Sequence, residues 1–295
     1  MVTQEERIFD GYGYVASTVT NVVSTLKRYR YSFMPEKEFR DLVERSTDPY
    51  ETDRICLTEI LERAHLAATT SLVRADRWIR GIYLSDDANN YILFTAAFRG
   101  LLESCADAHY ALATVPRTLA EHAEKMFEAL NLVPRSNSYM FQKLEDRLIH
   151  FSHGRRVRKE ELAPDSHSAL HMRDYINYLQ DSDAGPIHGF YSELCEVTHP
   201  AHDSVWCMLP KLDDSSWQLD VTFDRSLIGS LCLRHREAIA QFFPRGVAPS
   251  LMILGLINHM GLEHLKTPEM DHVDLSLIGR YQEFRAKIAS AFVLH

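Results

Sequence analysis

YILFTAAFRGLLESCADAHY, residues 91 to 110, is apolar on nearly every face of the helix that its spacing predicts, and this makes it the clearest sign of a helical core. A helix that is apolar all round is normally buried in a protein core. Arg99 and Glu103 nevertheless stand within it, four residues apart and therefore on one line of the helix. Buried charges are costly unless they are paired. We therefore expect these two side chains to enter the interior together, as an ion pair.

Helical signals continue on both sides of this segment. The residues from about 51 to 84 keep near-helical apolar spacing. Pro186 starts a helix that Pro200 must end or kink, because the residue before a proline is pushed out of the α region. Further helices are expected over 14–30, 116–132, 141–154, 166–179, 224–243 and 248–260, and from about 275 to the end.

One place departs from the helical pattern. Trp217, Leu219, Val221 and Phe223 alternate strictly with polar residues, and an apolar run precedes them across a turn-rich stretch. This alternation predicts a small β-hairpin near 204–223. No internal repeat or linker is found. The sequence therefore predicts an all-α, mainly helical fold, a multi-helix bundle of about ten helices in a single domain over residues 1–295.

The composition is that of an ordinary globular protein with an acidic balance. Hydrophobic residues make up 45% of the chain and the net charge is −9, so binding to nucleic acid would require a local basic patch. The five cysteines are scattered and form no CxxC pair, which is typical of reduced thiols in the cytoplasm. Neither a secretory signal nor an apolar run long enough to span a bilayer is found. We expect a cytoplasmic protein that binds no membrane.

A candidate site follows from the Arg99–Glu103 pair. The segment YSELCEVTHPAH, residues 191 to 202, places His199 where Pro200 ends its helix. An imidazole in the last turn of a helix lies in a field that favours its charged form and suits acid–base chemistry. Two interpretations are open. Either the pair is structural and His199 merely caps its helix, or the pair orients His199 and the three residues form a catalytic site.

A second candidate site is a basic stretch. Arg147 and His153 lie on the polar arc of a helix whose apolar residues face the core. Four cations follow this helix, namely Arg155, Arg156, Arg158 and Lys159. Together with Arg147 they make a local positive patch on an acidic protein, which is a credible contact for phosphate and so for RNA. The alternative is a solvated helix end whose cations offset the helix dipole.

The spacing of Arg147 and His153 fits the Arg-x(4–6)-His pattern of HEPN-type helical domains, which the chain resembles in this respect. HEPN domains occur in bacterial toxin and phage-defence ribonucleases. The segments AFRGLLES, residues 97 to 104, and Tyr191 to Pro200 are also similar to all-helical bacterial proteins grouped near that fold. The resemblance implies a homodimer in which Arg147 and His153 meet at the seam. It also implies cleavage of RNA without a metal, the 2′-hydroxyl attacking the adjacent phosphate.

Two other functions are open. The first is a non-enzymatic helical interaction module in which the Arg99–Glu103 pair is structural. The second is a metal-dependent helical enzyme that uses His167 and His171, one predicted helical turn apart, or the ExxH patterns typical of di-iron bundles. The residues of that di-iron arrangement would be Glu62, His65, Glu103, Glu196 and His199. We predict no cofactor and no metal as the first choice, since the chain has no Gly-rich phosphate loop, GxSxG or HExxH motif.

Overall fold

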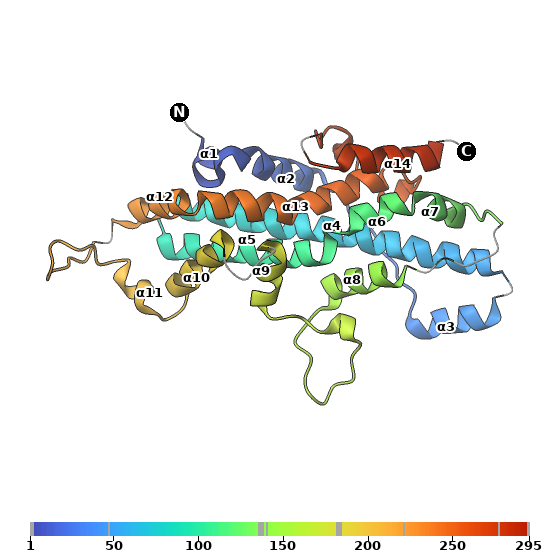
Figure 1. Ribbon diagram of the computed structural model, residues 1–295, viewed down its shortest axis with the longest axis horizontal. Helices are drawn as coiled ribbons and strands as arrows, with labels where there is room; N and C mark the ends of the chain where they lie inside the picture. Colours follow the sequence, from blue (N-terminus) through green and yellow to red (C-terminus); the bar gives the residue numbers. More distant parts are fainter. Residues whose placement is uncertain are drawn as a thin grey trace. The chain divides into compact units, whose positions relative to one another are not determined.

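A computed structural model describes residues 3–46, 48–134, 139, 141–180, 185–220, 222–276 and 278–293. Within these residues the regular elements are α-helices and short 3₁₀ turns, and no β-strand is formed (Figure 1). The predicted all-α fold class is therefore confirmed at the level of a mainly helical protein.

The described residues form the helices α1 to α14. The first seven are α1 (Gln4–Phe9), α2 (Gly13–Thr25), α3 (Glu36–Arg45), α4 (Pro49–Asp87), α5 (Tyr91–Leu112), α6 (Val115–Glu121) and α7 (Ala123–Leu130). The others are α8 (Gln142–His153), α9 (Met172–Gln180), α10 (Pro186–Thr198), α11 (His202–Trp206), α12 (Asp224–Arg234), α13 (Arg236–Ile257) and α14 (Tyr281–Val293). Short 3₁₀ turns are η1 (Asp10–Tyr12), η2 (Asp165–His167), η3 (Glu263–Leu265) and η4 (Pro268–Asp271).

The chain forms two compact units, each drawn from three stretches of sequence. Unit 1 contains Met1–Ser24, Ser71–Tyr110 and Leu170–Val247. Unit 2 contains Thr25–Thr70, Ala111–Ala169 and Ala248–His295. Helices α4, α5 and α13 each contribute residues to both units. The single domain over residues 1–295 stays a prediction.

Several helix ends differ from the prediction. The segment expected as one helix from Pro116 onward is divided at His122 into α6 and α7. Conversely, α13 continues through Pro244 and Pro249, where a break was expected. Each proline removes one helical N–H donor. Burial of the surrounding apolar side chains on α13 outweighs that cost, so the helix is not interrupted.

The hairpin predicted near 204–223 is not found as a pair of strands in the described residues. The first expected strand is instead the short helix α11. The side chain of Ser204 stabilises the start of this helix. Its hydroxyl accepts from the backbone N–H of Ala201 at 3.2 Å and donates to the Ala201 carbonyl at 2.7 Å. One antiparallel bridge joins Lys211 and Trp217. Val221, at the centre of the alternating pattern, lies outside the described residues.

The core of unit 1 is built around aromatic side chains. Phe9 of α1 stacks on Phe243 of α13 with ring centroids 4.7 Å apart, and the ring of Phe98, on α5, lies 5.8 Å from that of Phe9. Gly246 allows α13 to approach α5 closely, since a Cβ at this position would lie 2.3 Å from the Cβ of Cys105. Phe94 and Phe98 of α5 are fully buried, as expected for the apolar side of this segment.

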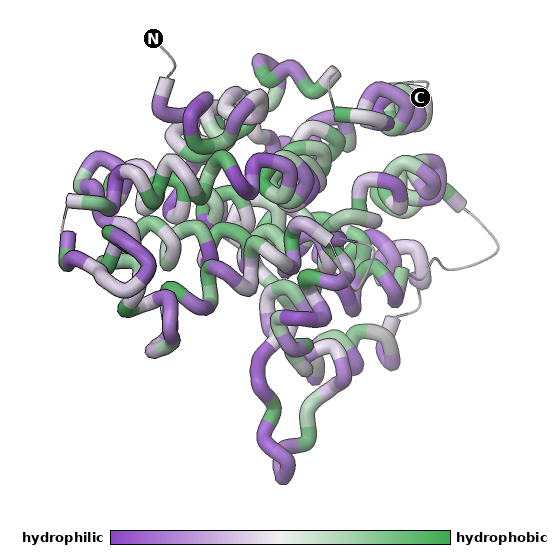
Figure 2. Tube along the Cα trace, turned by 60° about the vertical axis from the view of Figure 1, so that its left-hand side comes forward, coloured by the Kyte–Doolittle hydropathy of each residue, from purple (hydrophilic) through white to green (hydrophobic). Residues whose placement is uncertain are grey.

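In unit 2, α14 lies against α6 and α7. Phe127 of α7 meets Phe292 of α14 edge to face, with ring centroids 5.4 Å apart. The connection that follows α8, residues 154–171, is mostly hydrophilic in Figure 2, and most of its side chains are exposed. This connection therefore contributes little to the apolar core of unit 2.

Helix α13 is also the segment that bears on membrane binding. Within the described residues it alone is long and apolar enough to cross a bilayer. Its most apolar window of 18 residues has a mean hydropathy of 1.3. Of that window, 72% is buried inside the fold, which is typical of a core helix. The apolar run near residues 247–256, which was expected to be too short to span a bilayer, is part of this longer helix, because α13 continues through its two prolines.

Candidate functional site

Two helices of unit 1 bring Arg99, Glu103 and His199 together. Arg99 and Glu103 lie on α5, and His199 is the C-cap residue of α10, just before the proline that ends the helix. Figure 1 shows α10 beside α5. The segments are about a hundred positions apart in sequence, and the hydrogen bonds between them define the cluster.

The guanidinium of Arg99 is the centre of this cluster. Its Nε donates to Oε1 of Glu103 at 2.8 Å. Its Nη1 donates to Nε2 of His199 at 2.8 Å and to the hydroxyl of Thr198 at 3.2 Å. Burial opposes the charge of Arg99, but the hydrogen bond and negative charge of Glu103 outweigh it and raise the pKa of the guanidinium. Among the described residues, Nη2 has no hydrogen-bond partner, so one donor edge is open to a ligand.

The contact with Arg99 defines the hydrogen-bonding state of His199. A guanidinium has donors only, so Nε2 of His199 must accept the hydrogen bond. In this arrangement the ring is neutral and carries its proton on Nδ1. An anion that competes for the donors of Arg99 would release the Nε2 lone pair, which could then act as a base.

Glu103 connects the guanidinium to a second side chain of α10. Its Oε1 also accepts from the hydroxyl of Tyr191 at 3.1 Å, and the ring centroid of Tyr191 lies 5.9 Å from the guanidinium carbon of Arg99. Burial, followed by the negative charge of Glu103, raises the pKa of Tyr191. The hydroxyl therefore keeps its proton at neutral pH and stays a donor to Glu103.

The ion pair is not in the dry interior that the sequence predicts. The side chains of Arg99 and Glu103 are 24% and 28% exposed, and His199 is exposed. Ile92, two helical turns before Arg99 on the same line of α5, is itself 43% exposed. This line of α5 therefore lies at the surface, because α5 is covered on most of its faces but not on all. A ligand in solution can reach the cluster.

The other acidic residues of α10 have different roles. Glu193 accepts from Nε2 of His235 at 2.6 Å and also pairs with Arg234, on the neighbouring helix α12. The hydrogen bond from His235 is the main reason that the pKa of Glu193 is lowered. Glu196 is exposed. Neither carboxylate joins the Arg99 cluster.

On α8, in unit 2, Arg147 and His153 do not form a comparable cluster. Six residues along an α-helix correspond to about 600°, so the two side chains leave the helix about 120° apart. Arg147 is partly buried, whereas His153 is exposed. Nδ1 of His153 is hydrogen-bonded to the Ser152 hydroxyl at 2.7 Å, and its ring stacks on that of His167. Within one chain, these two residues do not face the same point.

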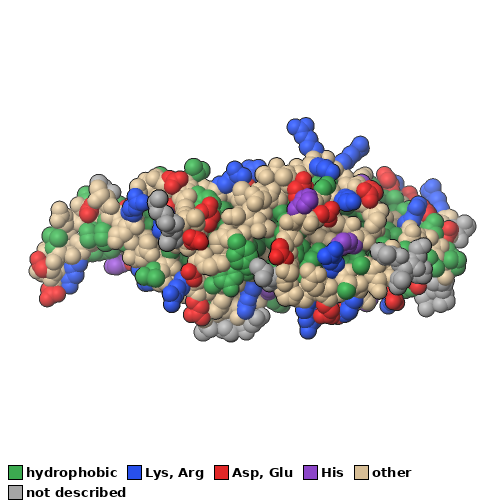
Figure 3. Space-filling model, turned by 90° about the horizontal axis from the view of Figure 1, so that it is seen from above, with side chains coloured by type: hydrophobic (Ala, Val, Ile, Leu, Met, Phe, Trp, Pro, Cys, Tyr) green, Lys and Arg blue, Asp and Glu red, His purple; other side chains and the backbone are tan. Residues whose placement is uncertain are grey.

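The basic stretch after α8 is exposed but not purely positive. Arg155 donates from Nη1 to Oε2 of Glu161 at 2.8 Å. Arg156, Arg158 and Lys159 are exposed, and Glu160 follows them directly. Figure 3 shows a different face, seen from above, on which positive and negative side chains are also interspersed. The local patch therefore consists of three cations next to acidic residues.

The residues considered for a metal site are not brought together. His167 belongs to η2 and His171 precedes α9, so the helix that would have aligned them is wrong. Buried His65 uses both ring nitrogens, Nδ1 with the Tyr31 hydroxyl at 2.8 Å and Nε2 with the Thr267 hydroxyl at 3.1 Å. In the part of the chain that the structure describes, no group of three or more His, Cys, Asp or Glu side chains could hold a metal ion.

Tyr191 and Thr198 are also members of the Arg99 cluster, although the sequence alone did not identify them as site residues. Together with Cys195 they follow the spacing i, i+4, i+7 along α10 and so lie on one face of that helix. That spacing was present in the sequence. The sequence did not indicate that this face of α10 packs against the side of α5 that carries Arg99.

Comparison with known proteins gives no relative for this site, because no protein-family model, curated protein or solved structure matches the chain.

Proposed function

We propose that the chain is a metal-independent endoribonuclease and that its phosphate-handling site is the cluster of Arg99, Glu103 and His199. The observation that supports this proposal is the 2.8 Å contact between Nη1 of Arg99 and Nε2 of His199. It places a cation for the phosphate and a neutral imidazole for the 2′-hydroxyl side by side at the surface. Glu103 and Tyr191 hold the cation in position.

The chemistry follows from these groups. A phosphate oxygen accepts from Arg99 and thereby releases Nε2 of His199. His199 takes the proton of the 2′-hydroxyl, the 2′ oxygen forms a bond to phosphorus, and the bond from phosphorus to the 5′ oxygen breaks. The leaving 5′ oxygen takes a proton from water, and His199 returns its proton to the hydroxide that this leaves, so the products are a 2′,3′-cyclic phosphate and a 5′-hydroxyl end and the imidazole is neutral again. Arg99 stabilises the charge that develops on the phosphate oxygens.

The HEPN resemblance belongs to the same proposal but places the chemistry elsewhere. In that version, Arg147 and His153 from two chains meet at the seam of a homodimer. The divergence of these side chains on α8 means that one chain alone does not assemble that site. We therefore assign the chemistry to Arg99 and His199, and give the exposed cations Arg156, Arg158 and Lys159 the role of a general RNA contact in a cytoplasmic defence or toxin protein.

The test uses the full-length protein and a fluorescent single-stranded RNA, with EDTA present. His199→Ala and Arg99→Ala should each lower the cleavage rate about 100-fold or more, as expected for loss of acid–base or electrostatic catalysis. His202→Ala is the matched control, since this exposed histidine lies three residues further on and pairs with Asp203. It should leave the rate within about twofold. An RNA with 2′-deoxyribose at the cleaved position should not be cut.

Three results would contradict the assignment. The first is an absence of RNA cleavage by the wild-type protein. The second is cleavage that survives in Arg99→Ala and His199→Ala but is lost in Arg147→Ala, which would move the site to α8. The third is cleavage of the 2′-deoxy substrate, which would exclude attack by the 2′-hydroxyl.

A second candidate is a non-enzymatic interaction module. It is favoured by exposed apolar side chains in and after α11. Those exposed by more than a third are Val205, Trp206, Leu212, Trp217 and Leu219. Trp206 and Trp217 are in edge-to-face contact, with ring centroids 5.1 Å apart, and exposed apolar side chains that gather in this way often mark a protein interface. If this is the function, Leu212→Ser with Leu219→Ser should abolish concentration-dependent self-association in sedimentation velocity, while Arg99→Ala leaves it unchanged.

A further inference from the structure

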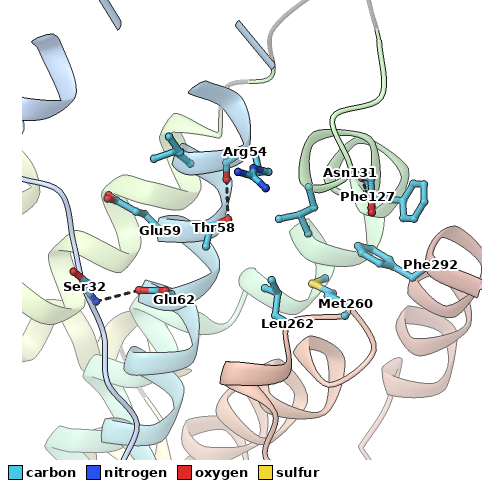
Figure 4. A pocket seen from close by; sticks show the side chains of 13 residues that line it. Ser32, Arg54, Thr58, Glu59, Glu62, Phe127, Asn131, Met260, Leu262 and Phe292 are labelled. Carbon is cyan, nitrogen blue, oxygen red and sulfur yellow. Dashed lines mark hydrogen bonds between the residues drawn. The ribbon is translucent and has the colours of Figure 1, made fainter. Parts of the chain in front are cut away.

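Unit 2 contains a pocket that is separate from the Arg99 cluster of unit 1. Its volume is about 620 Å³, within the range of small-molecule sites (Figure 4). One side is formed by Ser32 and by residues 54–62 of α4, and the others by the end of α7, the residues after α13, and α14. Of the residues singled out in the sequence, only Glu62 lines it.

The α4 wall carries two carboxylates that are fixed in place by backbone donors. Oε1 of Glu59 accepts from the backbone N–H of Met34 at 2.6 Å. Oε2 of Glu62 accepts from the backbone N–H of Ser32 at 3.3 Å, and its Oε1 lies 3.2 Å from Nε2 of His264. Among the described residues, Oε2 of Glu59 has no hydrogen-bond partner. The pocket therefore offers an oriented carboxylate with a vacant acceptor.

The opposite wall is mostly apolar, and its polar member, Asn131, donates from Nδ2 to the backbone carbonyl of Phe127 at 2.9 Å. Figure 4 shows Phe127 and Phe292 together on this side, with Met260 and Leu262 below them. The positive charge at the rim, Arg54, is paired with Glu51 at 2.6 Å, so it does not neutralise Glu59 or Glu62. The lining thus combines an acidic wall with an aromatic and aliphatic wall across one cavity.

This arrangement selects among ligand classes. An anionic ligand would be repelled by Glu59 and Glu62. A neutral apolar ligand would cover the carboxylates without a counter-charge, which is costly. An ammonium group instead gains charge-assisted hydrogen bonds from the acidic wall, and an attached apolar chain covers the aromatic wall. We propose that the unit 2 pocket binds a small organic ammonium ion that carries an apolar tail.

The experiment is isothermal titration calorimetry of the full-length protein at pH 7 with n-octylamine as the probe. Octanoate and 1-octanol, which have the same chain length, serve as the matched ligands. We expect saturable binding of one octylammonium per chain. The affinity for octanol should be at least tenfold lower, and octanoate should show no saturable binding.

Variants then test the wall. Glu59→Gln and Glu62→Gln keep an oxygen that accepts from the same backbone donors but remove the charge, and each should weaken octylammonium binding about tenfold, as for loss of one charge-assisted contact. Glu38→Gln, at an exposed position on α3 outside the pocket, is the matched control and should leave the affinity within twofold. Circular dichroism melts confirm that each variant is folded.

The proposal is overturned if octylammonium does not saturate, if octanol binds as tightly, or if the Glu59→Gln and Glu62→Gln proteins are folded and bind with wild-type affinity. Phe127→Ala provides a second, charge-neutral test, because it should weaken octylammonium binding but hardly affect the affinity for methylamine.

Discussion

Nδ1 of His109 lies 3.2 Å from the backbone carbonyl oxygen of Arg245. That carbonyl would normally accept from residue 249 in helix α13, but Pro249 has no N–H. The imidazole of His109 replaces the missing donor, so its proton is on Nδ1. This contact explains why a histidine lies on the apolar face of α5 and how α13 continues through a proline.

The first prediction concerns this replacement. His109→Phe should lower the free energy of unfolding by about 1–2 kcal/mol, because the Arg245 carbonyl loses a donor. In a Pro249→Ala background the same substitution should cost less, since the helix supplies its own N–H. Urea unfolding of the four proteins of this double-mutant cycle measures the difference. An equal cost in both backgrounds would show that the histidine does not serve the carbonyl.

The second prediction compares two glycines in helices of unit 1. Gly246→Ala should destabilise the protein by about 1–3 kcal/mol, because the new Cβ would overlap Cys105 and force α13 away from α5. Gly229→Ala, at an exposed position on α12 where an added Cβ would meet no other part of the structure within 4 Å, should stabilise it by about 0.5–1 kcal/mol through helix propensity. Thermal melts check both. If Gly246→Ala were as stable as the wild type, α13 and α5 could not approach as closely as described.

The third prediction concerns pH. Burial lowers the pKa of His65 from its ordinary value of 6.5 to about 4. The unfolded state therefore binds more protons than the folded state between these pH values, and stability falls as the pH falls through this window. Between pH 7.5 and pH 5 the loss from His65 should be about 2 kcal/mol.

Urea unfolding at the two pH values tests this loss. His65→Asn should reduce the pH dependence by about the same 2 kcal/mol, because the titrating group is gone. His272→Asn, which changes an exposed histidine, is the matched control and should leave the pH dependence as in the wild type. An unchanged slope in His65→Asn would mean that other groups cause the acid sensitivity.

The fourth prediction separates stability from activity at the Arg99 cluster. Glu103→Ala should lower the free energy of unfolding by about 1 kcal/mol, because the partly exposed pair and the Tyr191 hydroxyl lose their acceptor. Glu196→Ala, an exposed glutamate on α10, should change it by less than about 0.5 kcal/mol. Under the proposed function, Glu103→Ala also slows RNA cleavage at a temperature where it is fully folded. Loss of stability with an undiminished rate would favour a purely structural pair.

The sequence was informative where the determining contacts are local. The Arg99–Glu103 pair lies one turn apart on a single helix, and the end of α10 at His199 follows from Pro200, so both were predictable. It was less informative where distant segments decide the outcome. Whether Pro249 breaks α13 depends on a donor from α5, and whether the Arg99 line is covered depends on how α10 meets α5.

The alternating residues near 217–223 show the same limitation. Their pattern is typical of a strand, but a strand also needs a partner strand. The preceding residues, which would have formed that partner, form helix α11 instead, and the Ser204 side chain stabilises the start of this helix. Likewise, the predicted turn that would have aligned His167 with His171 depended on a helix that begins only after both.

The interleaving of the two compact units has a consequence for how this protein can be produced and can evolve. Because each unit is assembled from three separate stretches, no single gene fragment encodes either of them. Recombination could not transfer one unit to another protein as a cassette, and a ribosome must release the chain as far as Val247 before unit 1 is complete.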